Sequence, residues 1–160
     1  MTRRDNGKPM IEESDNQARR QRLRLLAGAA PADLAAALDE AGAVPDLRLV
    51  RAPECGLVMV RGRAGGTGER FNIGEMTVSR CTVADADGRL GVGMVAGRDR
   101  AKAEMVAKLD LVAQRPGPGA GIAARLLGRL EAQAARAAAA RAARAAATRV
   151  DFFTMVRGDD

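Results

Sequence analysis

The sequence predicts a single α+β domain in which N-terminal and C-terminal helices flank a four-stranded antiparallel meander sheet. Two helical segments precede four short strand-like runs, and further helical segments follow them. The runs have short connections, and consecutive strands with short connections pair as an antiparallel meander. Such a sheet needs a second layer to bury a face, and the helices supply it. A chain of 160 residues suits one hydrophobic core.

The N-terminal part is predicted to hold a disordered segment and two short helices. Residues 1–14 are polar and show no apolar period, so we expect them to be disordered. Residues 15–27 carry apolar side chains late in a charged run, which predicts the first helix. Residues 31–41 predict the second helix, because Pro31 suits a first helical position and Gly42 suits a helix end.

Four strand-like runs occupy the middle of the chain. Apolar and polar residues alternate in several of them, which is typical of half-buried strands. Pro53 and Gly56 frame a break between the first run and the second, and the Asp-Gly pair in residues 85–89 predicts a tight turn between the third and the fourth. The predicted strands are residues 47–51, 57–61, 76–83 and 90–95.

The sheet is followed by a third helix and a Pro-Gly linker. Asp99 is expected to cap a helix over residues 100–113, whose apolar stripe includes Leu109 while Asp110 points elsewhere. The Pro-Gly-Pro-Gly sequence at residues 116–119 is a linker that no helix would cross. We therefore divide the chain into a disordered segment at 1–14, a core domain at 15–115, the linker at 116–119 and a C-terminal unit at 120–160.

The C-terminal unit combines a simple helix with an apolar tail. Residues 121–147 are rich in Ala and Arg and have high helix propensity, but beyond Glu131 they have little bulk to bury. Residues 150–160 hold two of the three Phe, and burial of each would contribute about 1.5–3 kcal/mol. We expect this tail to dock, either on the chain's own sheet or on another subunit. The candidate interface residues are Phe152, Phe153, Met155, Val156 and Arg157.

The composition excludes several kinds of chemistry. The chain has no His, and Cys55 and Cys81 cannot make a metal site by themselves, so we assign no catalytic and no metal-binding residue. The net charge of +6 favours acidic partners. We expect both cysteines to be reduced in the cytoplasm, because the first residues do not resemble a signal peptide, and to be buried as small hydrophobes. No apolar run is long enough for a membrane span.

Two motifs are candidate contacts for phosphate or for a partner. The backbone of the glycine-rich segment, residues 65–70, could cradle a phosphate, with Arg70, Arg61 or Arg63 supplying charge. It lacks both familiar nucleotide-binding patterns, so a hairpin loop that turns the sheet or touches a partner is the favoured interpretation. Arg98 and Asp99, before the third helix, could bind an anion, or Asp99 could cap the helix beside a solvated arginine. The candidate contacts are Gly65, Gly66, Thr67, Gly68, Glu69, Arg70, Arg98 and Asp99.

Other charged residues are better explained as solvated surface. The arginines of the C-terminal helix form no continuous stripe, and the chain has no Trp or Tyr to stack on bases, so nucleic-acid binding is disfavoured. Four glutamates could act as acids or bases, but nothing in their spacing pairs them. They are Glu54, Glu69, Glu75 and Glu104.

Three stretches resemble the PhnG family, the G subunit of the carbon-phosphorus lyase system for phosphonate use. The similarity runs from about Ala18 to the end of the chain, and the order and spacing of the stretches match. One departure is Lys102, where the family often has His, so a catalytic role of that imidazole does not transfer. The stretches are residues 65–71 with 74–77 and Arg80, residues 97–99 with 103–104, and residues 149–159.

The resemblance implies a small subunit of a core complex with the H, I and J subunits, which acts together with the L protein. This family supports displacement of adenine from MgATP by a phosphonate, which gives a ribose 1-phosphonate 5-triphosphate. The nucleosidase-like I subunit is the expected seat of that chemistry. MgATP is then a substrate of the complex, and we expect this chain to bind no cofactor itself.

We therefore expect an auxiliary subunit whose glycine-rich segment and tail are contact surfaces. One rival hypothesis is an independent enzyme that binds a phosphonate or a triphosphate through Glu69, Arg70 and Arg98. A second rival is a nucleic-acid-binding module based on the arginine-rich helix, which would bind DNA with a strong dependence on salt.

Overall fold

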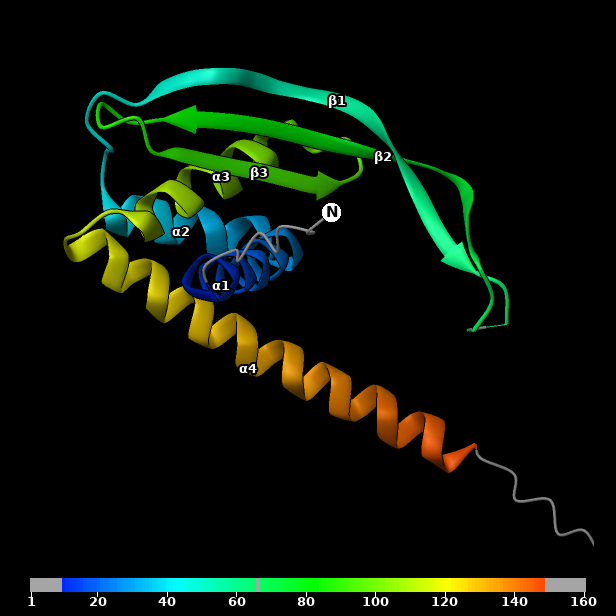
Figure 1. Cartoon of the computed structure of the whole chain (residues 1–160). Coiled ribbons are helices and arrows are strands. Elements are labelled where there is room, and N and C mark those ends of the chain that lie inside the picture. Colours follow the sequence, from blue (N-terminus) through cyan, green and yellow to red (C-terminus); the bar gives the residue numbers. More distant parts are fainter. Residues whose placement is uncertain (1–9, 66, 149–160) are drawn as a thin grey trace, which may run out of the picture.

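A computed structural model describes residues 10–65 and 67–148 (Figure 1). Two helices come before a three-stranded sheet and two come after it, which confirms the α+β class. In chain order the elements are α1 (Met10–Gly28), α2 (Pro31–Ala41), β1 (Arg48–Arg63), β2 (Arg70–Ala84), β3 (Leu90–Ala96), α3 (Arg100–Gln114) and α4 (Pro118–Ala147).

The sheet has three antiparallel strands in the order β1-β2-β3, so the prediction of four strands is wrong. The first two predicted strands are one strand, β1, which continues through Pro53 and Gly56. The register with β2 shifts between Arg51 and Glu54, so Pro53 lies in an irregular stretch of an outer strand, where a residue without an N–H group is tolerated. β2 also starts at Arg70, earlier than predicted, because its first residues pair with the end of β1.

Capping residues set several helix ends as predicted. Pro31 begins α2, and Gly42, with φ of 74°, ends it by donating its N–H to the carbonyl of Leu38. The Asp99 carboxylate accepts a hydrogen bond of 2.8 Å from the Lys102 N–H and caps α3. Each of these capping residues lies within a few residues of the helix end that it sets. The sequence therefore predicts these helix ends well.

Other boundaries differ from the prediction. Residues 10–14, expected to be disordered, form the first turn of α1. Pro118 and Gly119, assigned to the linker, form the first turn of α4, because proline fits a first helical position as well as it breaks a helix interior. The connection between α3 and α4 is therefore only residues 115–117.

α3 packs against β3 at backbone contact distance. A Cβ atom built on Gly93 would lie 1.9 Å from the carbonyl oxygen of Ala103, and one built on Gly91 would lie 2.1 Å from that of Ala107. Any side chain at these positions would push the helix off the sheet. The two glycines and the two alanines thus set the spacing between the layers.

The hydrophobic core lies between the sheet and the helices. Leu26 of α1, Leu34 of α2 and Leu126 of α4 are each at most 1% exposed and pack into the same cluster as the inward-facing residues of β2 and the buried side of α3. Figure 1 shows the helices on one side of the sheet. The helices are therefore the second layer that the sequence predicts.

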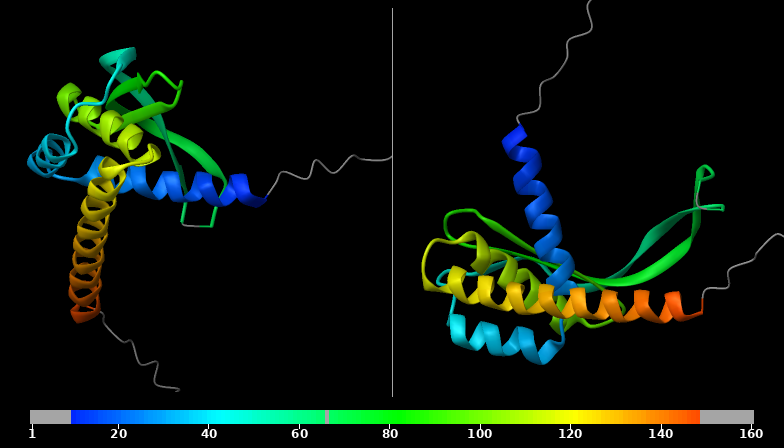
Figure 2. Two further views of the ribbon diagram at one scale, coloured as in Figure 1. Left: turned by 90° about the vertical axis from the view of Figure 1, so that its left-hand side faces the viewer. Right: turned by 90° about the horizontal axis from the view of Figure 1, so that it is seen from below.

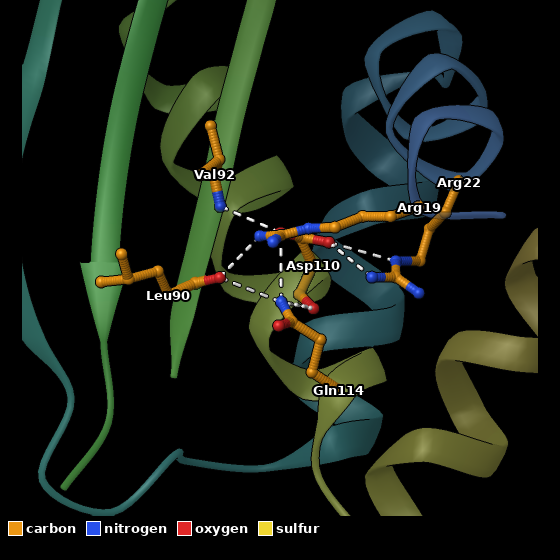
Figure 3. A network of polar contacts seen from close by, with 6 residues as sticks. All are labelled: Arg19, Arg22, Leu90, Val92, Asp110 and Gln114. Atoms are coloured by element: carbon orange, nitrogen blue, oxygen red, sulfur yellow. Dashed lines mark hydrogen bonds and ion pairs between the residues drawn. The ribbon is translucent and has the colours of Figure 1, made fainter. Parts of the chain in front are cut away.

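A buried carboxylate joins α1, α3 and β3 (Figure 3). Asp110 is fully buried, and its oxygens accept hydrogen bonds from Arg19 at 2.7 Å and from Arg22 at 2.9 and 3.1 Å. The Val92 N–H and the Gln114 amide complete the network at 3.1 and 3.2 Å. The expectation that Asp110 points away from the core is wrong, because two arginines of α1 supply the charge and the donors that permit its burial.

Two elements extend beyond this core. β3 pairs only with residues 78–84 of β2, so residues 57–63 of β1 and 70–77 of β2 form a two-stranded arm. In α4, residues 131–147 are all exposed. The arm and this end of α4 project to the same side of the molecule (Figures 1 and 2).

Candidate functional site

The glycine-rich segment is the turn at the tip of the arm. The Gly68 N–H donates to the Ala64 carbonyl at 3.0 Å, and Gly65 has φ of 59°. A Cβ atom on Gly68 would lie 2.8 Å from the Ala64 oxygen, so the turn leaves no room for a side chain there. Thr67 and Glu69 are exposed on it. The hairpin-loop interpretation is confirmed, and contact of this loop with phosphate stays a prediction.

Arg98 and Asp99 lie at the other end of the arm. The Gly97 N–H donates to the Thr77 carbonyl at 2.8 Å, which places the turn before α3 beside the arm's base. Arg70 precedes Thr77 by seven residues in the same strand, a separation of about 23 Å along the strand. The two groups of candidate phosphate contacts therefore lie at opposite ends of the arm and do not form one site.

The base of the arm holds a polar junction that no motif in the sequence predicts. The Cys55 sulfur lies 3.5 Å from the Ser79 hydroxyl and 3.9 Å from the Arg98 carbonyl oxygen, and the Ser79 hydroxyl donates to the Gly97 carbonyl at 3.0 Å. The Ser79 hydroxyl lowers the pKa of the Cys55 thiol when its single proton turns from the Gly97 carbonyl to the thiolate, and Arg100 adds to the effect. The junction holds β1, β2 and the turn before α3 together.

Both cysteines are free, as predicted, but their surroundings differ. Cys81 is buried in the core, and burial raises the pKa of its thiol. Cys55 is half-buried beside cationic groups, so describing it as a small buried hydrophobe is wrong. Only the pairing of β1 with β2 brings Ser79 opposite Cys55, and no local motif in the sequence carries that information.

Glu54 is ion-paired rather than simply solvated. Its carboxylate accepts hydrogen bonds from Arg51 at 2.7 Å and from Arg80, on the neighbouring strand, at 2.8 Å. The hydrogen bond from Arg51, followed by that from Arg80, lowers the pKa of Glu54. A carboxylate held in its charged form by two arginines is a poor proton acceptor at neutral pH, so Glu54 is unsuited to act as a general base.

The concave surfaces are separate from the predicted contacts. A cavity of about 650 Å³ lies between α2, α3 and the connection that leads to β1. Leu38, Val44, Leu47 and Met105 give it an apolar lining, and Lys108 is at its edge. None of the candidate phosphate contacts lines this cavity.

The described residues contain no group of three or more side chains suited to hold a metal ion. No helix in residues 10–65 and 67–148 is long and apolar enough to cross a membrane. The candidate interface residues Phe152, Phe153, Met155, Val156 and Arg157 lie outside the described part of the chain.

Large apolar side chains are exposed on the arm. Leu57 and Met59 of β1 are 61% and 60% exposed, and Ile73 of β2 is 62% exposed. Phe71 and Met76 add further apolar surface on β2. Clustered exposed apolar side chains are typical of surfaces that contact another molecule.

Fold and surface together define a small α+β protein with an apolar two-stranded arm and a long helix that project from one core. The family model described as "Phosphonate metabolism protein PhnG" matches residues 17–158, and the chain belongs to this family. It is also 46% identical over 145 residues to the "Alpha-D-ribose 1-methylphosphonate 5-triphosphate synthase subunit PhnG" of Rhizobium meliloti (strain 1021). The match covers 89% of this chain and 90% of that relative.

Proposed function

We propose that this protein is an auxiliary subunit of a ribose 1-phosphonate 5-triphosphate synthase in phosphonate catabolism. In this role it supports the displacement of adenine from MgATP by a phosphonate. The observation that carries the proposal is the 46% identity, over nearly the full length of both chains, to a protein named as a subunit of the methylphosphonate synthase.

The geometry supports an auxiliary role rather than independent catalysis. The candidate phosphate contacts are divided between the two ends of the arm, the chain has no His, and Glu54 is held in its charged form by arginines. The arm instead offers exposed apolar surface. We propose that its structural partners are the H, I and J subunits of the carbon-phosphorus lyase core complex. The L protein is proposed as a partner in the reaction.

Reconstitution of the synthase with and without this chain tests the proposal. The I, H and L proteins are incubated with MgATP and methylphosphonate, and released adenine is measured by chromatography. We expect release to depend on the presence of this chain and to be absent when the chain is alone. Substantial adenine release by the isolated chain would contradict the auxiliary role.

Calorimetric titration of the isolated chain with ATP and with methylphosphonate addresses the rival hypothesis of an independent enzyme. We expect no measurable binding of either ligand. Tight binding that is lost in the Arg70→Ala or Arg98→Ala variant would support the rival instead.

A further inference from the structure

The outer edge of β1 is open where the arm leaves the core. β1 is the first strand of the sheet, so its side facing away from β2 has no strand partner in the described chain. Near the core, Pro53 and two register shifts make this edge irregular. From Cys55 to Val60 the pairing with β2 runs without interruption. We call residues 55–63 the β1 edge. It contains no proline, and its one register shift, between Val60 and Arg61, places the extra residue, Ile73, on β2, so β1 itself has no bulge there. Proline and bulges in the edge strand are devices that protect an edge from further pairing.

The side chains of the β1 edge also lack cover. Leu57 and Met59 are two residues apart and project from the same face of the strand, and each is about three-fifths exposed. A two-stranded ribbon has little stability of its own in water, and a third strand would both pair the open edge and cover these side chains. An open edge with apolar side chains at alternate positions is the surface that binds an added strand.

Charge indicates the chemistry of the partner. Arg61, Arg63 and Arg70 lie at the outer end of the arm, and none of them makes an ion pair with another described residue. The exposed end of α4 carries three more arginines without such a pair, and it projects to the same side as the arm (Figures 1 and 2). The arm and the exposed end of α4 together carry six arginines against two exposed acidic residues of the arm, Glu69 and Glu75, so charge complementarity favours an acidic surface. These three arginines are Arg136, Arg141 and Arg144.

We propose that the β1 edge binds an extended segment of a partner subunit by strand addition. The segment has apolar side chains beside Leu57 and Met59 and carboxylates beside Arg61 and Arg63. This inference rests on the proposed function, since it assigns the synthase partner to a particular surface. The inference adds how the partner is bound. Backbone hydrogen bonds between the β1 edge and the added strand provide the affinity, and the charged and apolar side chains fix the register of that strand.

Residue-resolved hydrogen exchange of the chain, free and in the reconstituted complex with the H, I and J subunits, tests the proposal. In an antiparallel sheet, the N–H groups of alternate residues point to opposite sides of a strand. We expect alternate amides of residues 55–63 to exchange at least about tenfold more slowly in the complex, while the exposed residues of α1 keep their free rates. Contact through side chains alone would not produce this alternation.

A pair of charge-reversal variants tests the chemistry of the segment. Arg61→Glu combined with Arg63→Glu places negative charge beside the predicted carboxylates and should weaken assembly at least about tenfold. Arg20→Glu combined with Arg24→Glu changes the net charge equally on exposed positions of α1 and should leave assembly unchanged. Equal thermal melting curves of the two double variants show that both fold.

Several outcomes would overturn the strand addition. One is a complex that assembles, and that releases adenine once the L protein, MgATP and methylphosphonate are added, while the amides of residues 55–63 keep their free exchange rates. In that case the proposed function stands and the inference fails. Another is protection of the β1 edge in the isolated chain that rises with concentration, since the added strand would then come from a second copy. Equal weakening of assembly by both charge-reversal variants would also contradict it, because net charge alone would explain the effect.

Discussion

The two halves of β2 have similar alternating sequences but opposite surroundings. Residues 78–84 pair with both neighbouring strands, and Ser79, Cys81 and Val83 are fully buried. Residues 70–76 pair only with β1, and Phe71 and Ile73 are at least half exposed. Apolar residues alone therefore do not determine burial in this chain. The half next to β3 is covered by the chain's own helices, and the other half is left for contact with another molecule.

Removing the Asp110 carboxylate should have the largest effect on the core. In Asp110→Ala, Arg19 and Arg22 lose their shared partner, and the Val92 N–H loses its acceptor. Loss of one side of a buried ion pair typically costs about 3–5 kcal/mol. Urea unfolding monitored by circular dichroism measures the change. A loss below about 1 kcal/mol would show that the network does not hold α1 to α3.

Truncation of two leucines compares the core with the arm directly. Leu109 is fully buried and Leu57 is 61% exposed. Leu109→Ala should reduce the free energy of unfolding by about 2–5 kcal/mol, because it removes transfer energy and leaves a cavity. Leu57→Ala should change it by less than about 0.5 kcal/mol, as at most exposed positions. The comparison fails if both variants lose similar stability in urea unfolding of the isolated chain.

Two glycines make a matched pair with a smaller expected effect. Gly93→Ala brings a methyl group onto the Ala103 carbonyl of α3 and should cost about 1–3 kcal/mol as overpacking. Gly74, in the arm, has no atom within 4 Å of a built Cβ, so Gly74→Ala should be close to neutral. Thermal melting of both variants checks this difference. Equal melting temperatures would mean that α3 shifts without cost.

The smallest expected effect is a pH dependence at the base of the arm. The folded pKa of Cys55 lies below its ordinary value of 9.0, chiefly through Ser79, so the pH midpoint of its alkylation by iodoacetamide should also lie below 9.0. Any stabilisation from its thiolate is therefore present above the unfolded pKa and is lost as the pH falls through the folded pKa. Ser79→Ala should move the midpoint upward. Cys81 serves as the internal control, because it is buried and its pKa is raised.

Local signals in the sequence predict much of the helical part of this fold. Pro31, Gly42 and Asp99 mark helix ends through backbone geometry and capping, which depend only on neighbouring residues. The turn between β2 and β3 is also confirmed, with Gly88 at φ of 80°. The continuity of β1 is not predictable in the same way. Whether Pro53 breaks a strand depends on its position in the sheet, and no local pattern shows that β1 is the outer strand.

The candidate site shows the same limit. The sequence identifies the glycine-rich turn and the Arg98–Asp99 turn as candidate contacts. In the structure the first closes the tip of the arm, and in the second Asp99 caps α3. The distance between the two turns follows from the length over which β1 and β2 pair. The sequence does not predict this length, because it predicts β1 as two shorter strands. The burial of Asp110 was missed because a charged residue next to an apolar stripe is usually solvated, and its arginine partners come from about 90 positions earlier in the chain.

The exposed end of α4 is a helical extension whose length and rotation are set by its number of residues. Residues 131–147 extend it by about 25 Å, and each residue adds about 1.5 Å of rise and 100° of rotation. Deleting one residue would therefore turn the end of α4 by more than a quarter of a revolution relative to the core, whereas deleting seven residues would nearly preserve the orientation of that end and shorten the helix by about 10 Å. A change in the length of this helix would therefore move and rotate its arginines relative to the arm, whereas exchanging one exposed alanine for another helix-forming residue would not.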